Sequence, residues 1–163
     1  MDARPFIDSL DFAENGRQIS GKVPVAGLPR LLDVLDSHQG TLEYTLRGGA
    51  DKQGHPLLDV NITGNCRLRC QRCLGAMEHA IRIATRLLLK DQASLDAMDD
   101  DEEEAFESIL ADTHLDVLSL LEEEILLSLP FAPRHESGTC QMTDEPIKQK
   151  ENPFAALVKL KRN

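Results

Sequence analysis

The chain has 163 residues, which fits one ordinary domain with tails and is long enough to bury a core without disulfide staples. Its net charge of −10 argues against tight, non-specific coating of nucleic acid, because phosphate affinity comes from an excess of cationic side chains. Aromatic residues are few, with five Phe, one Tyr and no Trp, so platforms for stacking single-stranded bases are scarce. Docking through a local basic patch remains compatible with this composition.

The beginning of the chain and its cysteines bear on the cellular compartment. Asp8, Asp11 and Glu14 come before any apolar run develops, which is not the pattern of a secretory signal. No apolar stretch approaches the roughly 18 residues that span a bilayer. Four cysteines in such a chain point to a reducing cytoplasm, where paired cysteines bind metal more often than they form disulfides. We therefore expect a cytoplasmic protein without a membrane partner.

Apolar and polar residues alternate with a period of two through much of the first half, which predicts strands. One strand is expected over about 17–25 and a second over about 42–47. Between them, residues 27–37 predict a short helix, with Pro29 in its first turn. The glycine-rich residues 48–54 predict a loop.

The clearest alternation runs from Leu58 to Cys70, with one face apolar and the other polar without exception. This pattern predicts a long half-buried strand with a bend at Gly64. The alternation resumes from Ile81 to Leu89. The two strands are expected to form a hairpin within an antiparallel meander that has one solvated side, with Cys70-Gln71-Arg72-Cys73 at the tip.

Basic residues concentrate around this hairpin. Residues 66–90 hold six Lys or Arg against one acid, a local charge of +5. The candidate contacts with a macromolecular partner are four arginines of the exposed hairpin face and one of the turn: Arg67, Arg69, Arg82, Arg86 and Arg72. Phosphate contact by arginine needs no sequence motif, so the signal is weak by itself. The alternative that these charges serve solubility, or pair with an acidic loop, stays open.

The next forty residues, 91–130, contain fourteen Asp or Glu and no Lys or Arg. Residues 91–104 predict a solvated, mobile acidic loop, because like charges repel and bury nothing. Asp116 can cap a helix over 117–129 that ends at Pro130. Its expected core stripe is Leu118, Leu121, Ile125 and Leu129, with Glu122, Glu123 and Glu124 largely on the outer side.

Together these elements predict an α+β fold. An antiparallel meander of four or more strands packs with two main helices, near 28–37 and 117–129, and an irregular C-terminal tail follows. The expected organisation is a single α+β domain over residues 1–134, which carries the mobile acidic loop at about 91–104. An extended tail, with room for a short terminal helix, covers residues 135–163.

Cys70 and Cys73, followed by Gly75, resemble a zinc knuckle, in which backbone amides of a tight turn point at both thiolates. Zinc takes four ligands in tetrahedral geometry, so this pair is half a site. His135 and Cys140 are the candidates for the other half, because the preceding helix can carry their loop back to the hairpin tip. Such a zinc would be structural. A knuckle-like turn without metal stays open as the alternative, since 61 residues separate Cys73 from His135.

The fourth cysteine and the missing motifs limit the other options. Cys66 shares the parity of Ile62 and Leu68 and is expected in the core. A thioredoxin-type redox pair fits poorly, because that chemistry places its first cysteine at a helix N-terminus, whereas strands flank this turn. The sequence has no P-loop, dinucleotide glycine fingerprint, nucleophile elbow or HExxH motif. We expect neither catalytic residues nor a small-molecule substrate.

Four features make the chain similar to one known family. They are Cys70-Gln71-Arg72-Cys73-Leu74 after a long strand, the helix from Leu115-Asp116 to Leu129-Pro130, Pro133-x-His135 with Cys140 downstream, and the ending Asn152-Pro153-Phe154-Ala155-Ala156-Leu157 with Lys159-Leu160-Lys161. In order and spacing they resemble the large ribosomal RNA subunit accumulation proteins, the YceD family. Some of these relatives place extra cysteines after this helix, where the chain has His135 and Cys140.

The resemblance implies a non-enzymatic role in making, processing or stabilising 23S rRNA, and so in assembly of the large ribosomal subunit. The implied partners are precursor rRNA or large-subunit ribosomal proteins, and no catalytic residue is carried over. Two alternatives remain. One is a protein-binding adaptor for ribosomal proteins without RNA contact. The other, less favoured, is a redox or metal-handling protein with a reactive thiol at Cys70 or Cys73.

Overall fold

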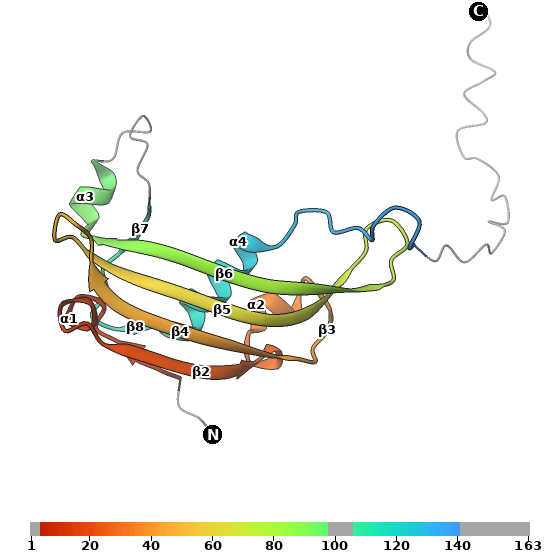
Figure 1. Cartoon of the computed structure of the whole chain (residues 1–163), viewed down its shortest axis with the longest axis horizontal. Coiled ribbons are helices and arrows are strands. Elements are labelled where there is room, and N and C mark those ends of the chain that lie inside the picture. Colours follow the sequence, from red (N-terminus) through yellow and green to blue (C-terminus); the bar gives the residue numbers. More distant parts are fainter. Residues whose placement is uncertain (1–3, 98–105, 141–163) are drawn as a thin grey trace, which may run out of the picture.

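The computed structural model describes residues 4–97 and 106–140 and confirms the α+β class (Figure 1). Its elements follow in the order β1 (Phe6–Ile7), α1 (Ser9–Glu14), β2 (Gln18–Pro24), η1 (Val25–Gly27), α2 (Pro29–Leu32), β3 (Leu35–Ser37), β4 (Thr41–Ala50), β5 (Pro56–Arg69), β6 (Ala76–Lys90), α3 (Gln92–Asp96), β7 (Glu107–Leu110), β8 (Leu115–Asp116) and α4 (Val117–Ser128). None of the helices within the described residues is long and apolar enough to cross a bilayer.

Six strands form the main sheet, in the order β2-β4-β5-β6-β7, with β3 paired to β5. The β2, β4, β5 and β6 strands make the expected antiparallel meander. The β7 strand, however, joins β6 in parallel, so the sheet is mixed and not antiparallel throughout. Sixteen residues separate β6 from β7, enough for the crossover that a parallel return needs. A further small sheet pairs β1 with β8.

The β5 and β6 strands are the longest elements and form the predicted hairpin, in register from Leu57 opposite Leu88 to Arg69 opposite Ala76. The β5 strand outruns β4, whose pairing stops at Gly64. Beyond that point the free edge of β5 is paired by β3, with Leu35 opposite Leu68. The demand of this edge for backbone partners explains why the last residues of the helix expected at 28–37 form a strand instead.

The expectation of two main helices was wrong. The segment predicted as one helix is divided into η1, the four-residue α2 and β3, so only α4 is long. The sequence reading missed α1, which Asp8 caps by accepting a hydrogen bond from the Asp11 amide. Gly48 lets α1 pack on β4, because a Cβ there would lie 2.2 Å from the Phe12 carbonyl oxygen. The β4 strand continues to Ala50, so its last three residues occupy part of the segment 48–54 that was predicted to be a loop.

Two further expectations concern parts of the chain that are only partly described. The acidic segment expected at 91–104 begins with the short helix α3, and its run from Asp99 to Glu104 lies outside the described residues. Most of the expected C-terminal tail, residues 141–163, also lies outside them. The division of the chain into residues 1–134 and 135–163 stays a prediction.

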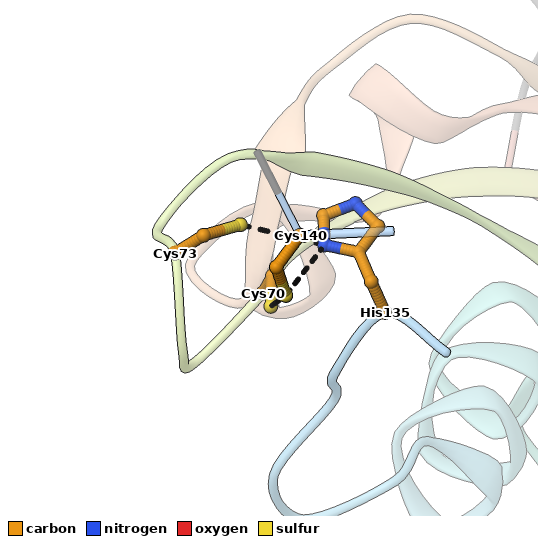
Figure 2. A group of neighbouring side chains, drawn as sticks. All are labelled: Cys70, Cys73, His135 and Cys140. Carbon is orange, nitrogen blue, oxygen red and sulfur yellow. Dashed lines mark hydrogen bonds between the residues drawn. The ribbon is translucent and has the colours of Figure 1, made fainter. Parts of the chain in front are cut away.

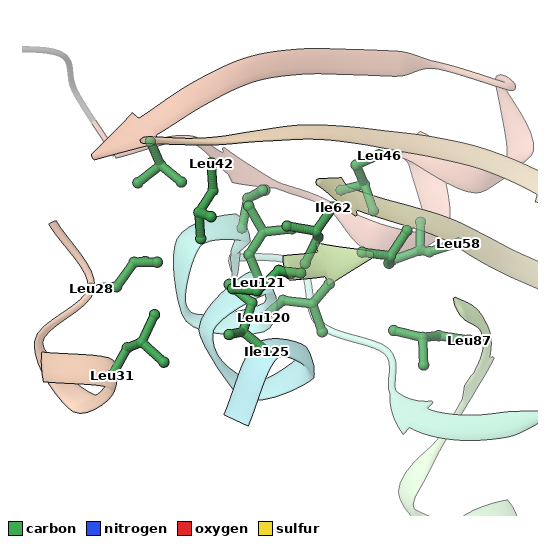
Figure 3. Close-up of a cluster of buried hydrophobic side chains, with 14 of the residues drawn as sticks. Leu28, Leu31, Leu42, Leu46, Leu58, Ile62, Leu87, Leu120, Leu121 and Ile125 are labelled. Carbon is green, nitrogen blue, oxygen red and sulfur yellow. The ribbon is translucent and has the colours of Figure 1, made fainter. Parts of the chain in front are cut away.

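The core lies between the sheet and α4, which crosses behind it (Figures 1 and 3). Leu121 and Ile125 of α4 are fully buried, as predicted, while Leu118 and Leu129 are partly buried. The helix begins where expected, because the Asp116 carboxylate accepts hydrogen bonds from the amides of Leu118 and Ser119 at 3.0 and 3.3 Å. On its far side, α4 packs against α2, where Leu28 and Leu31 are fully buried (Figure 3).

Two of the three glutamates expected on the outer side of α4 are buried. Glu122 is 2% exposed and Glu124 is 6% exposed, so the prediction held only for Glu123. A Glu122 oxygen accepts a hydrogen bond from the Leu31 amide at 3.0 Å. Leu31 lies in the first turn of α2, and the side chain of the N-cap residue Leu28 cannot cap this helix. Glu122 of α4 therefore supplies the acceptor that an N-terminal amide of α2 needs. Burial, then repulsion from neighbouring glutamates, raises the pKa of the Glu124 carboxyl.

Replacing Glu122 by alanine is expected to lower the free energy of unfolding by about 1–2 kcal/mol, the lower part of the range for a buried hydrogen bond lost. The effect is limited because the Leu31 amide also reaches the Leu28 carbonyl oxygen at 3.1 Å. Urea unfolding of Glu122→Ala, Glu122→Gln and Glu123→Ala measures it. Glu122→Gln keeps an acceptor oxygen and should lose less than Glu122→Ala. An equal loss in the exposed control Glu123→Ala would refute the capping role.

Candidate metal centre and basic sheet face

Three cysteines and one histidine lie together at the hairpin tip (Figure 2). The candidate ligand atoms of Cys70, Cys73, His135 and Cys140 all lie within 4.8 Å of one another. Two come from the turn between β5 and β6, and two from the segment after α4, which runs alongside the hairpin to its tip (Figure 1). The fold therefore brings together the two halves that the sequence had placed 61 residues apart.

The turn holds its cysteines through backbone hydrogen bonds. The Leu74 amide donates to the Cys70 carbonyl oxygen at 2.9 Å, and the Cys70 amide donates to the Gly75 carbonyl oxygen at 2.9 Å. The Arg72 amide points at the Cys70 sulfur, 3.4 Å away. Leu74 has a φ of +61°, the left-handed conformation that closes the turn. An amide that faces the Cys70 sulfur is compatible with the zinc-knuckle turn predicted from the sequence.

The segment after α4 is fastened to the turn by main-chain and side-chain contacts. The Gln71 amide donates to the Pro133 carbonyl oxygen at 2.8 Å. The His135 Nε2 lies 3.1 Å from the Ala76 carbonyl oxygen, which can only accept, so Nε2 carries the proton and donates it. In the neutral ring, Nδ1 then presents its lone pair to the sulfurs of Cys73 and Cys140, at 3.4 and 3.6 Å. Proteins orient a metal-binding histidine through a hydrogen bond of this kind, which is made by the ring nitrogen that does not face the metal.

The electrostatics of the cluster favour a thiolate at Cys70. Hydrogen bonds, above all from the Cys73 amide, lower the pKa of the Cys70 thiol to about 5 although its burial opposes this. Burial, and then the neighbouring sulfurs Cys70 and Cys73, raise the pKa of Cys140. Cys66 is 2% exposed, a core residue as predicted, and burial raises its pKa to about 11. Cys66 is thus a buried thiol, whereas the other three cysteines lie with His135 in the candidate ligand cluster.

The distances can be compared with those of a tetrahedral site. Zinc bonds of about 2.3 Å to sulfur and about 2.0–2.1 Å to nitrogen place two sulfurs about 3.8 Å apart, and a sulfur and a nitrogen about 3.6 Å apart. Here the Cys70 and Cys140 sulfurs are 3.7 Å apart, and the two sulfur-to-Nδ1 distances are 3.4 and 3.6 Å. Donor types and spacing are therefore compatible with a zinc site of four protein ligands.

The predicted binding arginines occupy the solvated side of the hairpin. The β5 and β6 register places Arg67, Arg69, Arg82 and Arg86 on the same face, and all four are exposed, as is Arg72 in the turn. The residue opposite Arg69 lies ten positions from Arg86 along β6, so the four form a strip about 33 Å long. They share a face, but they do not form a tight cluster.

Three of these arginines already have acidic partners. Arg69 pairs with Asp36 at 3.3 Å, Arg86 with Asp59 at 2.8 Å, and Arg67 more loosely with Glu78 at 3.8 Å. Arg86 also lies over the Phe106 ring, 5.5 Å from its centroid. Arg82 and Arg72 make no ion pair with any residue in the described ranges.

The basic face is wider than the hairpin. The β2 and β4 strands extend it, so its charged members are Lys22, Glu43, Arg47, Asp59, Arg67, Arg69, Glu78, Arg82 and Arg86. Six are basic and three acidic, and Asp36 of β3, which pairs with Arg69, adds a fourth acid, for a net charge of +2. No described helix covers this part of the sheet face, from Arg69 to Arg86. The sequence reading missed Lys22 and Arg47, although both stand on the polar parity of their predicted strands.

Matches to known proteins extend over most of the chain. The family described as large ribosomal RNA subunit accumulation protein YceD matches residues 58–161, a range that includes all but the first two residues of the hairpin and all four candidate ligands. The large ribosomal RNA subunit accumulation protein YceD of Haemophilus influenzae is 25% identical over 167 aligned residues, which cover 96% of this chain and 94% of that protein. No solved structure gives a significant match. Since the family match spans well over half of the chain, this protein belongs to the YceD family.

Proposed function

We propose that this protein is a cytoplasmic ribosome-biogenesis factor that acts by binding rather than by catalysis. It supports the synthesis, processing or stability of 23S rRNA, and through it the assembly of the large ribosomal subunit. The link to large-subunit ribosomal RNA comes from the description of the family and from the name of the Haemophilus influenzae relative. The observation that supports binding is the uncovered sheet face, which has a net charge of +2 on a chain of −10 and so leaves −12 for the rest.

Precursor rRNA is proposed to lie along this face and to be held through its phosphates. Arginine presents a planar fork of donors that suits phosphate oxygens. Arg82 and Arg72 can donate hydrogen bonds to phosphate without first breaking an ion pair, since they make none within the described residues. Arg67, Arg69 and Arg86 would exchange an acid for a phosphate. The strongly acidic remainder keeps non-specific affinity low, because it repels phosphate wherever the basic face is not engaged.

A ribonuclease experiment separates this proposal from the alternative of an adaptor that contacts only ribosomal proteins. The tagged protein is captured from cells with its large-subunit precursors, and half of the sample is treated with ribonuclease before washing. RNA binding predicts that 23S precursor RNA and the ribosomal proteins are both lost on treatment. Retention of one defined ribosomal protein after full digestion would support the adaptor and overturn direct RNA binding.

We also infer that Cys70, Cys73, His135 and Cys140 hold one structural zinc ion. When bound, zinc would crosslink the segment after α4 to the tip of the β5–β6 hairpin. Four protein ligands leave no open position for substrate, which fits a structural role. Elemental analysis of protein purified without chelator should find about one zinc per chain. Less than about half an equivalent would refute the four-ligand site.

A further inference from the structure

A mostly apolar groove of about 780 Å³ lies beside the candidate metal centre. The last turn of α4 and the residues after it form one side, and the hairpin turn and the end of α2 form the other. Its apolar lining comes mainly from six side chains: Val34, Leu68, Leu74, Leu126, Leu129 and Phe131. Asp33 and Arg69 stand among its polar neighbours, and Arg69 is already paired with Asp36. The groove shares Arg69 with the basic face and is lined by none of the four candidate metal ligands.

Three of the six apolar side chains that line the groove are exposed to solvent. Phe131 is fully exposed, Leu74 is 67% exposed and Val34 is 47% exposed. Contiguous apolar surface of this kind marks a binding site more often than a scattered exposed leucine does. Leu74 adds a second argument, because its φ of +61° is costly for a leucine and easier for asparagine or glycine. A large apolar side chain at this position is consistent with a contact partner.

The end of the described chain lies next to this groove. The Cys140 sulfur is 3.7 Å from that of Cys70, and Gln71 and Leu74 of the same turn line the groove. Twenty-three residues follow Cys140 in the sequence. The twelve residues of 141–152 can span roughly 40 Å when extended, so the residues after them can reach any part of the groove.

The sequence after residue 152 has the composition that such a groove would accept. Phe154, Leu157 and Val158 follow the i, i+3, i+4 spacing of one helix face. Asn152 followed by Pro153 matches the start of a helix. The basic residues near its end, Lys159, Lys161 and Arg162, complement the exposed Asp33 at the groove and the acidic chain as a whole.

We propose that the groove binds the chain's own C-terminal segment, residues 153–160. Phe154, Leu157 and Val158 pack against Leu74 and Phe131, which would otherwise face water. Since the candidate metal ligands hold both the turn and the segment after α4, the same centre that positions His135 and Cys140 also shapes the groove. This inference goes beyond the proposed function and does not depend on it, because the tests use the purified full-length chain without RNA.

Photo-crosslinking identifies the occupant. Benzoylphenylalanine replaces Phe131, which is fully exposed, and the same residue replaces Leu127 as a control that is 66% exposed but does not line the groove. Irradiation at low protein concentration should link position 131 to residues 153–160 within monomers, and mass spectrometry of the digest locates the link. Links found only in dimers would show that a second copy fills the groove and overturn the proposal, as would links elsewhere or equal linking from position 127.

Hydrogen exchange tests the contact without a crosslinker. Amides of residues 154–160 should exchange at least about tenfold more slowly than an unprotected peptide, and Leu74→Asp should abolish this protection. Aspartate tolerates positive φ, so the turn is kept, which an unchanged metal content checks. Leu127→Asp is the matched control and should leave the protection intact. Exchange of this segment at the unprotected rate in the unsubstituted chain would overturn the proposal.

Discussion

Cys70→Ser is expected to reduce the zinc content from about one equivalent per chain to well below half. Serine keeps the size of the side chain but removes the sulfur whose pKa the Cys73 amide holds near 5, the best-prepared thiolate of the cluster. Metal coordination in small zinc sites contributes on the order of 10 kcal/mol, far more than the single hydrogen bonds around the turn. Elemental analysis and hydrogen exchange of residues 131–140 measure the loss of zinc and the release of that segment.

The comparison set for this experiment is provided by the chain itself. Cys140→Ser should behave like Cys70→Ser, because both sulfurs belong to the cluster. Cys66→Ala removes a thiol that is buried in the core and whose pKa is raised to about 11, so it should keep its zinc while losing some stability. Zinc retained at one equivalent in both ligand variants would exclude these ligands. Zinc lost equally in Cys66→Ala would point to general unfolding.

The second large effect is expected from reversing charge on the basic face. The double variant Arg72→Glu with Arg82→Glu should lose association with large-subunit precursors at physiological salt. These two arginines make no ion pair within the described residues, so their reversal should spare the fold. If each contacts one phosphate, the slope of log affinity against log salt should fall by about 2. Co-sedimentation with precursor particles over a series of salt concentrations measures both quantities.

The matched control changes the same amount of charge elsewhere. Arg30→Glu with Lys52→Glu reverses two exposed residues that lie outside the basic sheet face. Association should be nearly unchanged in this variant, because loss of overall charge acts weakly at a distance in physiological salt. Equal weakening in both double variants would mean that net charge, rather than the face, governs binding. Unchanged association of Arg72→Glu with Arg82→Glu would rule out these two contacts.

Local chemistry made several elements readable from the sequence. The period-two alternation from Leu58 onward predicted β5 and which of its residues are buried, because a strand places successive side chains on opposite faces. Asp116 marked the start of α4 because a short carboxylate can cap the amides that directly follow it. The same alternation placed Arg67 and Arg82 on one exposed face. In each case the pattern and its cause lie within a few residues.

The geometry of the candidate metal centre could not be predicted from local sequence patterns alone. The spacing of Cys70 and Cys73 predicts half of a metal site, and the sequence also offers His135 and Cys140 as candidates for the other half. The 3.4 Å approach of His135 Nδ1 to the Cys73 sulfur depends on α4 carrying its following segment back along the hairpin. The hydrogen bond from its Nε2 to the Ala76 carbonyl oxygen has no signature in the sequence.

By itself, the sequence determined the strands of the meander, their buried and solvated faces, the start of α4 and the residue types for a metal site. Only the tertiary structure decided that β7 joins β6 in parallel, that residues 35–37 pair with the free edge of β5, and that Glu122 is buried against α2. The physical reason is the same for all three. An unpaired backbone amide or strand edge is satisfied by whichever group the fold brings near, and that group can lie anywhere along the chain.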